Sequence, residues 1–179
     1  MADSKRRLSR KDWIDAAIAM GAEQGFDRIA VDALAPRLGA TRGSFYWHFR
    51  DRAELVQAVL EEWERAATSN TIERLQGVSA DEALEQVISV AFNAGHLEDQ
   101  AEWRLIGMAD DPQIGPVVAR VHQRRLAFVE QLLSAKGLPD AEAAERARLA
   151  YVAYLGWLAL RQLEPDGPNL GPALLRLIG

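Results

Sequence analysis

The stretch TRGSFYWHF, from Thr41 to Phe49, holds the densest set of chemically useful side chains in the chain. Four aromatic residues and a histidine occupy its last five positions. Successive residues of a helix are about 100° apart around its axis. If Phe45 and Phe49 face a core, the opposite arc therefore carries groups that can bond or stack: Arg42, Gly43, Ser44, Tyr46, Trp47 and His48.

These residue types in this order suit the surface of a DNA duplex. Arginine pairs with guanine edges or phosphates, tyrosine and histidine donate to phosphate oxygens, and glycine lets a backbone approach closely. Tryptophan can stack on a sugar or contact a thymine methyl group. The alternative is that FYWHF is a core patch of a small helical domain. Against it, Tyr46, Trp47 and His48 cannot all join the face of Phe45 and Phe49 in one helix.

The elements around this stretch form a recognisable layout. We predict a first helix from about Ser9, its cap, to about Glu23, with Gly25 ending it, and a second over roughly 31–38. After a tight turn at 39–41, Thr41 can cap a third short helix. Two short helices joined by a tight turn are the layout of a helix-turn-helix. A fourth helix is predicted over 51–68, with Asp51 as its cap and Glu54 at capping-box spacing.

The remainder of the chain also has helical periodicity, with no convincing alternating strand. Gly- and Pro-containing segments divide it into five further helices, predicted at roughly 81–93, 100–108, 116–135, 140–162 and 169–178. The predicted fold is all-α, with three short N-terminal helices followed by a bundle of longer ones.

Charge is distributed unevenly along the 179 residues. Residues 1–52 contain ten Lys or Arg and seven Asp or Glu, a balance of +3, whereas the remainder carries 11 basic and 19 acidic residues, a balance of −8. The sum is the overall net charge of −5. A basic head on an acidic body indicates a polyanion-binding role for the head, although chance and a solvated basic tail are an alternative.

Residues 9–64 resemble the DNA-binding domain of the tetracycline-repressor-like (TetR) transcriptional regulators, most specifically in GATRGSFYWHFRDRAEL. The resemblance implies a DNA-binding domain over 1–52, the fourth helix 51–68 as a connector, and a ligand-binding and dimerisation domain over 69–179. It places Thr41, Arg42, Gly43, Tyr46, Trp47 and His48 at DNA-facing positions. It also places Arg52 near phosphate at the start of the fourth helix, with Arg10 and Lys11 as weaker phosphate candidates.

Three residues depart from the pattern of that family. Gly21 stands where a large aromatic residue is usual, so we expect Phe26 or Phe45 to fill the gap. Ala30 replaces a frequent Ser or Thr cap before the second helix. Pro36 lies inside that helix, which should therefore be short, late-starting or bent.

The last two helices point to self-association. The segment from Ala147 to Leu160 is apolar on nearly every side, and NLGPALLRLIG at the end of the chain is mostly apolar as well. Such helices must be buried on all sides. The alternatives are an intramolecular core or a twofold homodimer. The family resemblance implies the homodimer, with two recognition helices on a palindromic DNA site.

The resemblance further implies a pocket for a small-molecule effector among the remaining helices. Candidate lining residues are Phe92, Asn93, His96, Trp103, Met108, His122, Phe128, Tyr151, Tyr154 and Trp157. No charge cluster interrupts the apolar stretches, which favours an apolar or aromatic effector.

Several function classes find no support in the sequence. There is no cysteine, no Glu-x-x-His pair, no His-Glu-x-x-His motif and no Gly-rich phosphate loop. We therefore expect no catalytic residues, no metal and no cofactor. We find neither a signal peptide nor an apolar run long enough for a membrane span, so we expect a cytoplasmic protein.

The sequence thus predicts a ligand-responsive DNA-binding homodimer, most simply a repressor of transcription. The alternative is a helical small-molecule or partner-binding protein without sequence-specific DNA binding.

Overall fold

A computed structural model describes residues 7–179 of the chain, and all regular secondary structure among them is helical. Residues 1–6, which include two of the ten basic residues of the head, lie outside the described residues. The predicted all-α class is confirmed. Within the described residues, no helix has the length and apolarity needed to cross a bilayer.

The N-terminal elements are α1 (Arg10–Gln24), the 3₁₀ turn η1 (Phe26–Arg28), α2 (Val31–Arg37) and α3 (Arg42–Phe45). The Ser9 hydroxyl accepts a hydrogen bond from the Asp12 amide at the start of α1. The Asp12 carboxylate in turn accepts from the Ser9 amide, which completes a capping box. Gly25, with a φ of 107°, ends the helix in a conformation that favours glycine.

The second helix is short, as expected for a segment with an unfavourable start and a proline. Ala30 stands at the N-cap without any side-chain bond, and Pro36 lies one residue before the last residue of the seven-residue α2. Gly39, with a φ of 58°, makes the turn that follows. Thr41 then caps α3 by accepting from the Ser44 amide at 3.3 Å.

A long helical rod follows, made of α4 (Arg52–Glu64), a π-helical segment η2 (Arg65–Ser69) and α5 (Asn70–Arg74). Asp51 caps α4 by accepting from the Glu54 amide, as predicted. The Glu54 carboxylate bonds the amide of Arg50 rather than that of Asp51, so the capping-box partner differs by one residue. The rod also continues six residues beyond the predicted end.

The remaining helices are α6 (Ala80–Phe92), α7 (His96–Ile106), α8 (Gly115–Ala135), α9 (Asp140–Leu163) and α10 (Gly171–Ile178). Their bounds lie within two residues of the predictions, except that α7 begins four residues earlier than expected. Ser79 caps α6 by accepting from the Glu82 amide.

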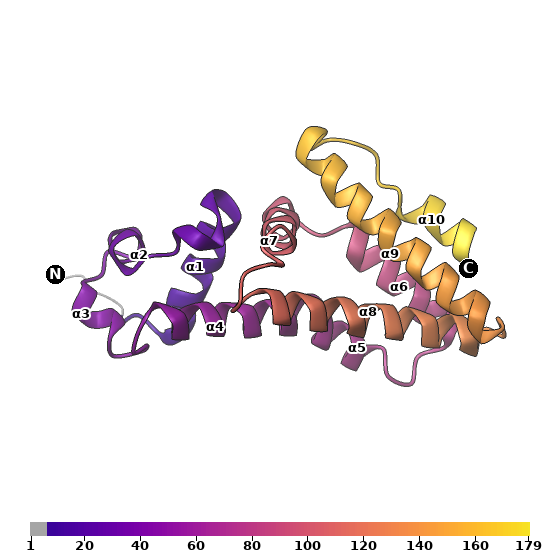
Figure 1. The fold of residues 1–179 in the computed structure, drawn as a ribbon, viewed down its shortest axis with the longest axis horizontal. Coiled ribbons are helices and arrows are strands. Elements are labelled where there is room, and N and C mark those ends of the chain that lie inside the picture. Colours follow the sequence, from indigo (N-terminus) through magenta and orange to yellow (C-terminus); the bar gives the residue numbers. More distant parts are fainter. Residues whose placement is uncertain (1–6) are drawn as a thin grey trace, which may run out of the picture.

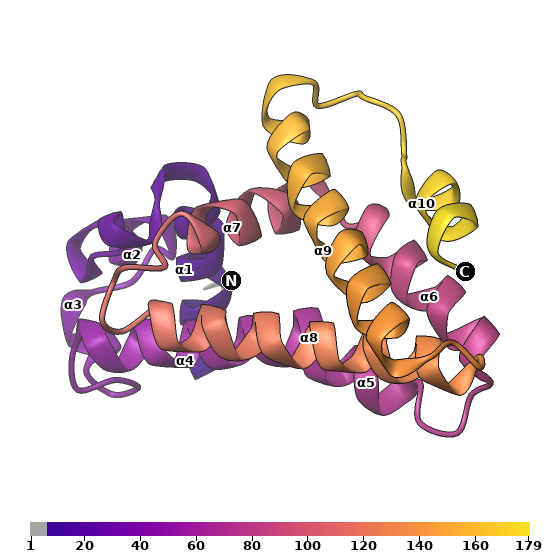
Figure 2. The same cartoon turned by 45° about the vertical axis from the view of Figure 1, so that its right-hand side comes forward.

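Figures 1 and 2 show how these helices are arranged. The α4 rod and α8 run side by side along the length of the molecule, with α1, α2 and α3 at one end. At the other end, α6, α9 and α10 pack over α8, and α7 stands between the two groups. The N-terminal head is therefore connected to the rest by α4 and also touches it through α7.

Two hydrophobic clusters make up the core. The first joins the head to α4, α7 and α8, and includes Trp13, Phe26, Phe45, Leu105 and Val121. The second joins α6, α8, α9 and α10. The gap left by Gly21 is filled by Phe26, since a Cβ atom on Gly21 would lie 2.6 Å from the Phe26 ring. The first cluster thus extends from the head into α7 and α8 of the body.

Candidate DNA-binding face and ligand cavity

The aromatic stretch divides into a buried side and an exposed side. Phe45 and Phe49 are fully buried and stack on each other, with ring centroids 5.4 Å apart, and Trp13 meets Phe45 edge-on. Tyr46 and Trp47 are 55% and 81% exposed. The predicted division of this stretch is confirmed. Two large rings stand in solvent because their neighbours on either side are anchored in the core.

The other predicted contact residues lie around these rings. Thr41, Arg42 and Gly43 are exposed, and Ser44 and His48 are half-buried. Nothing hinders a close approach at Gly43, since a Cβ atom there would meet only the Thr41 hydroxyl, at 3.7 Å. The exposed residues follow directly on the tight turn after α2, as in a recognition helix.

The candidate DNA-binding cations are held by exposed carboxylates. Arg42 pairs with Asp32 of α2 at 3.0 Å. Arg10 reaches Glu54 at 3.5 Å and lies over the Phe49 ring, and Lys11 pairs with Asp15 at 2.6 Å. Hydrogen bonding to Asp15 raises the pKa of Lys11. Because exposed ion pairs are weak, a phosphate can replace these carboxylates at little cost.

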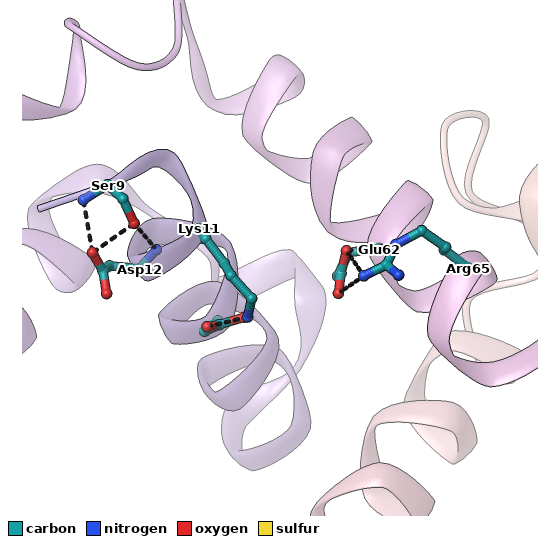
Figure 3. A network of polar contacts seen from close by, with 6 residues as sticks. Ser9, Lys11, Asp12, Glu62 and Arg65 are labelled. Carbon is teal, nitrogen blue, oxygen red and sulfur yellow. Dashed lines mark hydrogen bonds and ion pairs between the residues drawn. The ribbon is translucent and has the colours of Figure 1, made fainter. Parts of the chain in front are cut away.

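Figure 3 shows the start of α1, where the Ser9–Asp12 capping box and the Lys11 side chain lie on neighbouring turns. Across from them, Arg65 is bonded to Glu62 on the rod, at 2.6 Å. Lys11 therefore extends along α1 toward Asp15 on the next turn of the helix.

Arg52 is engaged differently from its predicted role near phosphate. Its guanidinium donates to the main-chain carbonyls of Ile29, Phe26 and Asp27, at 2.5, 3.0 and 3.2 Å. It thus ties the start of α4 to the η1 turn. Arg50 was not predicted as a contact, yet its side chain is 83% exposed beside the aromatic stretch. Sequence position alone could not separate these two arginines, because both flank the same cap.

A cavity of about 690 Å³ opens between the α4 rod and helices α6 to α9. Five of the ten predicted ligand-contacting residues line it: Phe92, Asn93, Phe128, Tyr151 and Tyr154. Trp63 of α4 adds a fifth aromatic ring, which the sequence analysis did not single out.

The other five predicted residues do not line the cavity: His96, Trp103, Met108, His122 and Trp157. His96 is exposed at the start of α7 and contacts Gln100, while Met108 packs against the first core cluster. His122 packs on the outer side of Tyr151, and burial lowers the pKa of its ring. Aromatic character alone could not assign them, because the inward face of each helix depends on its packing.

The cavity wall contains a buried ion pair that the sequence analysis did not anticipate. Arg125 of α8 donates to both carboxylate oxygens of Glu102 of α7, the second at 3.0 Å. The two side chains are only 16% and 7% exposed. Burial would lower the pKa of Arg125, but Glu102 raises it above its ordinary value. The sequence analysis found no charge cluster in the apolar stretches, but packing brings these two charged residues together in the cavity wall.

Arg125 also connects the cavity to the rod. It donates to the Thr68 hydroxyl at 2.9 Å and to the Ala67 carbonyl at 3.2 Å, both within the π-helical segment η2. Next to it, Arg124 donates to Ser69 at 2.9 Å and to Glu64. The π-helical segment therefore lines the cavity and is part of the rod that leads to the head. Such segments are often found at functional sites.

Helix α7 connects the body to the head a second time. Arg104 donates to the carbonyls of Ala22 and Glu23 at the end of α1, at 2.7 and 3.1 Å. At the other end of α7, buried Asp99 pairs with Arg161 of α9, while burial raises the pKa of Asp99. A shift of α7 against the cavity would thus pull directly on α1.

One side of α9 is apolar and uncovered. Leu149, Val152, Leu160 and Leu163 are all exposed, and their spacing puts them on one stripe with Gly156 at its centre. Leu177 of α10 is exposed as well. The prediction that this helix is covered on every side does not hold within a single chain.

The head is similar to a known family of proteins. Residues 14–59 match the family described as "Bacterial regulatory proteins, tetR family". The chain is 27% identical over 131 residues to the HTH-type transcriptional regulator SrpR of Pseudomonas putida, with 70% of this chain and 59% of that protein covered. It thus spans less than two thirds of the length of that relative.

Two further comparisons extend over nearly the whole chain. The HTH-type transcriptional repressor KstR2 of Mycobacterium tuberculosis is 28% identical over 179 residues, with 89% of this chain and 83% of that protein covered. The crystal structure of a TetR transcriptional regulator from Legionella pneumophila superposes with a TM-score of 0.78, covering 99% and 96% of the two chains at 14% identity. The second likeness supports the fold alone.

Proposed function

The chain belongs to the TetR family of bacterial regulatory proteins, and on this basis we propose that it is a DNA-binding repressor of transcription. It binds a palindromic operator as a homodimer in the cytoplasm, and a small apolar or aromatic effector releases it. Its DNA-binding domain covers residues 1–52, and the fourth helix, 51–68, connects this domain to the rest of the chain. Residues 69–179 bind the effector and the second protomer. Membership of this family of regulators also agrees with the expectation that the chain is not an enzyme.

The exposed Tyr46 and Trp47 carry this proposal. They project beside Arg42 from a capped turn whose Phe45 and Phe49 are buried in the core. Large aromatic side chains held in water by a rigid anchor favour a contact surface. The neighbouring exposed cations favour a polyanion as the partner, and the layout of a helix-turn-helix favours the major groove of duplex DNA.

The apolar stripe of α9 supports the homodimer. Leu149, Val152, Leu160 and Leu163 would be covered by the same stripe of a second protomer, and Gly156 at its centre would allow the two helices to approach closely. A twofold axis through this stripe would present two heads to a palindromic site.

The cavity supports control by an effector. Its walls include residues of α1 in the head, of the rod and of α6, α7, α8 and α9, and α7 and the rod connect the body to the head. An effector that moves either element would change how the two heads are spaced. The effector can be coupled to DNA binding only if it binds the two arrangements of the heads with different affinities.

The test is selection of binding sites from a random duplex library by the purified protein, with Tyr46→Ala as the matched control. We expect enrichment of a palindrome that the variant fails to recover. If the folded, dimeric wild type enriches no sequence, the DNA-binding proposal is wrong and a small-molecule or partner-binding protein becomes the better description.

A further inference from the structure

The polar groups in the cavity wall satisfy one another almost completely. Arg125 donates to both carboxylate oxygens of Glu102, to the Thr68 hydroxyl and to the Ala67 carbonyl, so four of the five N–H donors of its guanidinium are used. Glu102 matches the charge of Arg125, and Arg125 also lies over the ring of Tyr154, 5.9 Å from its centroid. The buried pair is therefore neutral as a unit.

The Tyr151 hydroxyl is available to a ligand. Its side chain is half-buried, and within residues 7–179 no acceptor for its proton is found. Burial raises the pKa of Tyr151, so the phenol keeps that proton at neutral pH. Tyr151 lines the cavity beside the apolar and aromatic part of its wall.

The charges of the wall disfavour an anion. Four carboxylates and one guanidinium line the cavity: Asp15, Glu62, Glu98, Glu102 and Arg125. Asp15 and Glu62 are neutralised from outside the cavity by Lys11 and Arg65. A ligand carboxylate could form a two-bond ion pair with Arg125 only by displacing Glu102, which would leave a buried carboxylate without its partner. Loss of one partner from a buried pair is strongly unfavourable.

We propose that the effector is an uncharged molecule with an apolar or aromatic body and one hydrogen-bond acceptor, such as a carbonyl or ether oxygen, that accepts from the Tyr151 hydroxyl. Because the Arg125–Glu102 pair is neutral as a unit, it disfavours carboxylates. This inference rests on the proposed function only in taking the cavity as the effector site.

Four naphthalene probes of nearly the same shape test this specificity by isothermal titration calorimetry. They are 2-acetylnaphthalene, its oxygen-free 2-isopropenyl analogue, 2-naphthoate and the 2-naphthamidinium cation. We expect the acetyl compound to bind about tenfold more tightly than the isopropenyl analogue, as a buried hydrogen bond allows. We expect 2-naphthoate to bind more weakly than either. Tightest binding by the carboxylate or the cation would overturn the proposal.

Tyr151→Phe and Tyr154→Phe form a matched pair. Each removes one hydroxyl from the cavity wall, but Tyr154 is buried, whereas the half-buried Tyr151 offers its proton to the ligand. We expect Tyr151→Phe to abolish the preference for the acetyl compound and Tyr154→Phe to retain it. Equal loss in both variants would contradict the assignment.

A second pair tests the exclusion of carboxylates. Glu102→Gln keeps an acceptor for Arg125 but removes its neutralising charge, so 2-naphthoate should bind about tenfold more tightly than to the wild type. Glu98→Gln removes one charge from the same cavity and leaves the Arg125 pair intact, so it should not have this effect. An equal gain in 2-naphthoate affinity for both variants would mean that the net charge of the cavity alone sets this affinity. That result would refute the role of the Arg125–Glu102 pair.

Operator binding is measured separately by fluorescence anisotropy with each probe present. If the probes rank as expected but none changes DNA binding, the ligand class stands and the proposed release by an effector fails. If no probe binds while DNA binding is intact, the ligand class is wrong and the DNA-binding proposal is unaffected.

Discussion

At the scale of single residues, Arg42 and Tyr46 should contribute to DNA binding in different ways. Tyr46→Ala removes a phosphate donor and should weaken binding to every sequence. Arg42→Ala should in addition relax the preference at one base pair, by about 1–3 kcal/mol if the contact is bidentate. Competition binding with operators changed at single positions measures this. Equal losses on all sequences for both variants would remove the base-reading role of Arg42.

Gly21 allows a second prediction at this scale. Replacing a helical glycine with alanine usually stabilises a protein, by about 0.5–1 kcal/mol. Here the new Cβ would lie 2.6 Å from the Phe26 ring. We expect Gly21→Ala to destabilise instead, by about 1–3 kcal/mol. Urea unfolding measures the difference, with Gly43→Ala, whose Cβ meets no close neighbour, as the control. A gain in stability from Gly21→Ala would mean that Phe26 moves aside freely.

The sequence alone predicted the burial and the capping role of individual residues wherever the spacing along the chain determines them. The burial of Phe45 and Phe49, the caps at Ser9, Thr41 and Asp51, and the filling of the Gly21 gap all follow from positions a few residues apart. Arg125 and Glu102 are 23 residues apart and come together only through the packing of α7 on α8. No local pattern distinguishes them from the many other charged residues of an acidic body.

At the scale of secondary-structure elements, Glu64 holds the rod against α8. It accepts from Arg120 at 2.5 Å and from Arg124 at 3.1 Å, and its side chain is largely buried. Hydrogen bonding to Arg120 lowers the pKa of Glu64 below its ordinary value of 4.5. We expect Glu64→Gln to lower the free energy of unfolding at pH 7 by about 1–3 kcal/mol.

The pH dependence of this loss has a definite sign. Because the folded pKa is depressed, the stabilisation by Glu64 is present above pH 4.5 and is lost as the pH falls through the folded pKa. The stabilities of wild type and variant should therefore converge below pH 4.5. Urea unfolding at pH 7, 5 and 3.5 compares them, and a constant difference across this range would exclude the ionised form of Glu64 as the cause.

Arg104 of α7 should transmit the state of the cavity to the head. Arg104→Ala removes its two bonds to the carbonyls that end α1. We expect the variant to keep operator binding and effector binding while the coupling between them falls several-fold. Anisotropy titrations of DNA with and without effector give the coupling directly. An unchanged coupling would leave the rod as the only route.

The existence of most helices was predictable from the sequence, but α5 and the π-helical segment η2 were not. Periodicity and Gly–Pro breakers located α6, α8, α9 and α10 to within two residues. The predicted fourth helix ended at Thr68, so the sequence analysis missed α5. The π-helical segment before it has no sequence signature of its own, and Arg124 and Arg125 of α8 bond its Ser69 and Thr68. These contacts exist only in the folded chain.

At the scale of the whole molecule, the proposed homodimer is the first property to test. Val152→Glu places a charge in the middle of the exposed stripe of α9 and should yield monomers in sedimentation experiments. Binding of a palindromic operator should fall by orders of magnitude, because one head then binds alone. Leu97→Glu, at an exposed apolar position on α7, is the control. A dimeric Val152→Glu protein would place the interface elsewhere.

The salt dependence of DNA binding reports on the two heads together. If they neutralise about six phosphates in total, log K should fall with log salt concentration at a slope of about −5. Binding measured from low to moderate salt gives this slope. A value near zero would mean that the basic head does not contact the DNA backbone.

The core shared by the head and α7 limits how this protein can be recombined. Leu105 and Val121, far along the chain from the head, pack in the same cluster as Trp13 and Phe45. A chimera that joined only residues 1–68 to the body of another regulator would leave an apolar face of α1 uncovered. A successful graft would have to transfer α7 together with the head, so the exchangeable unit of this protein is discontinuous in sequence.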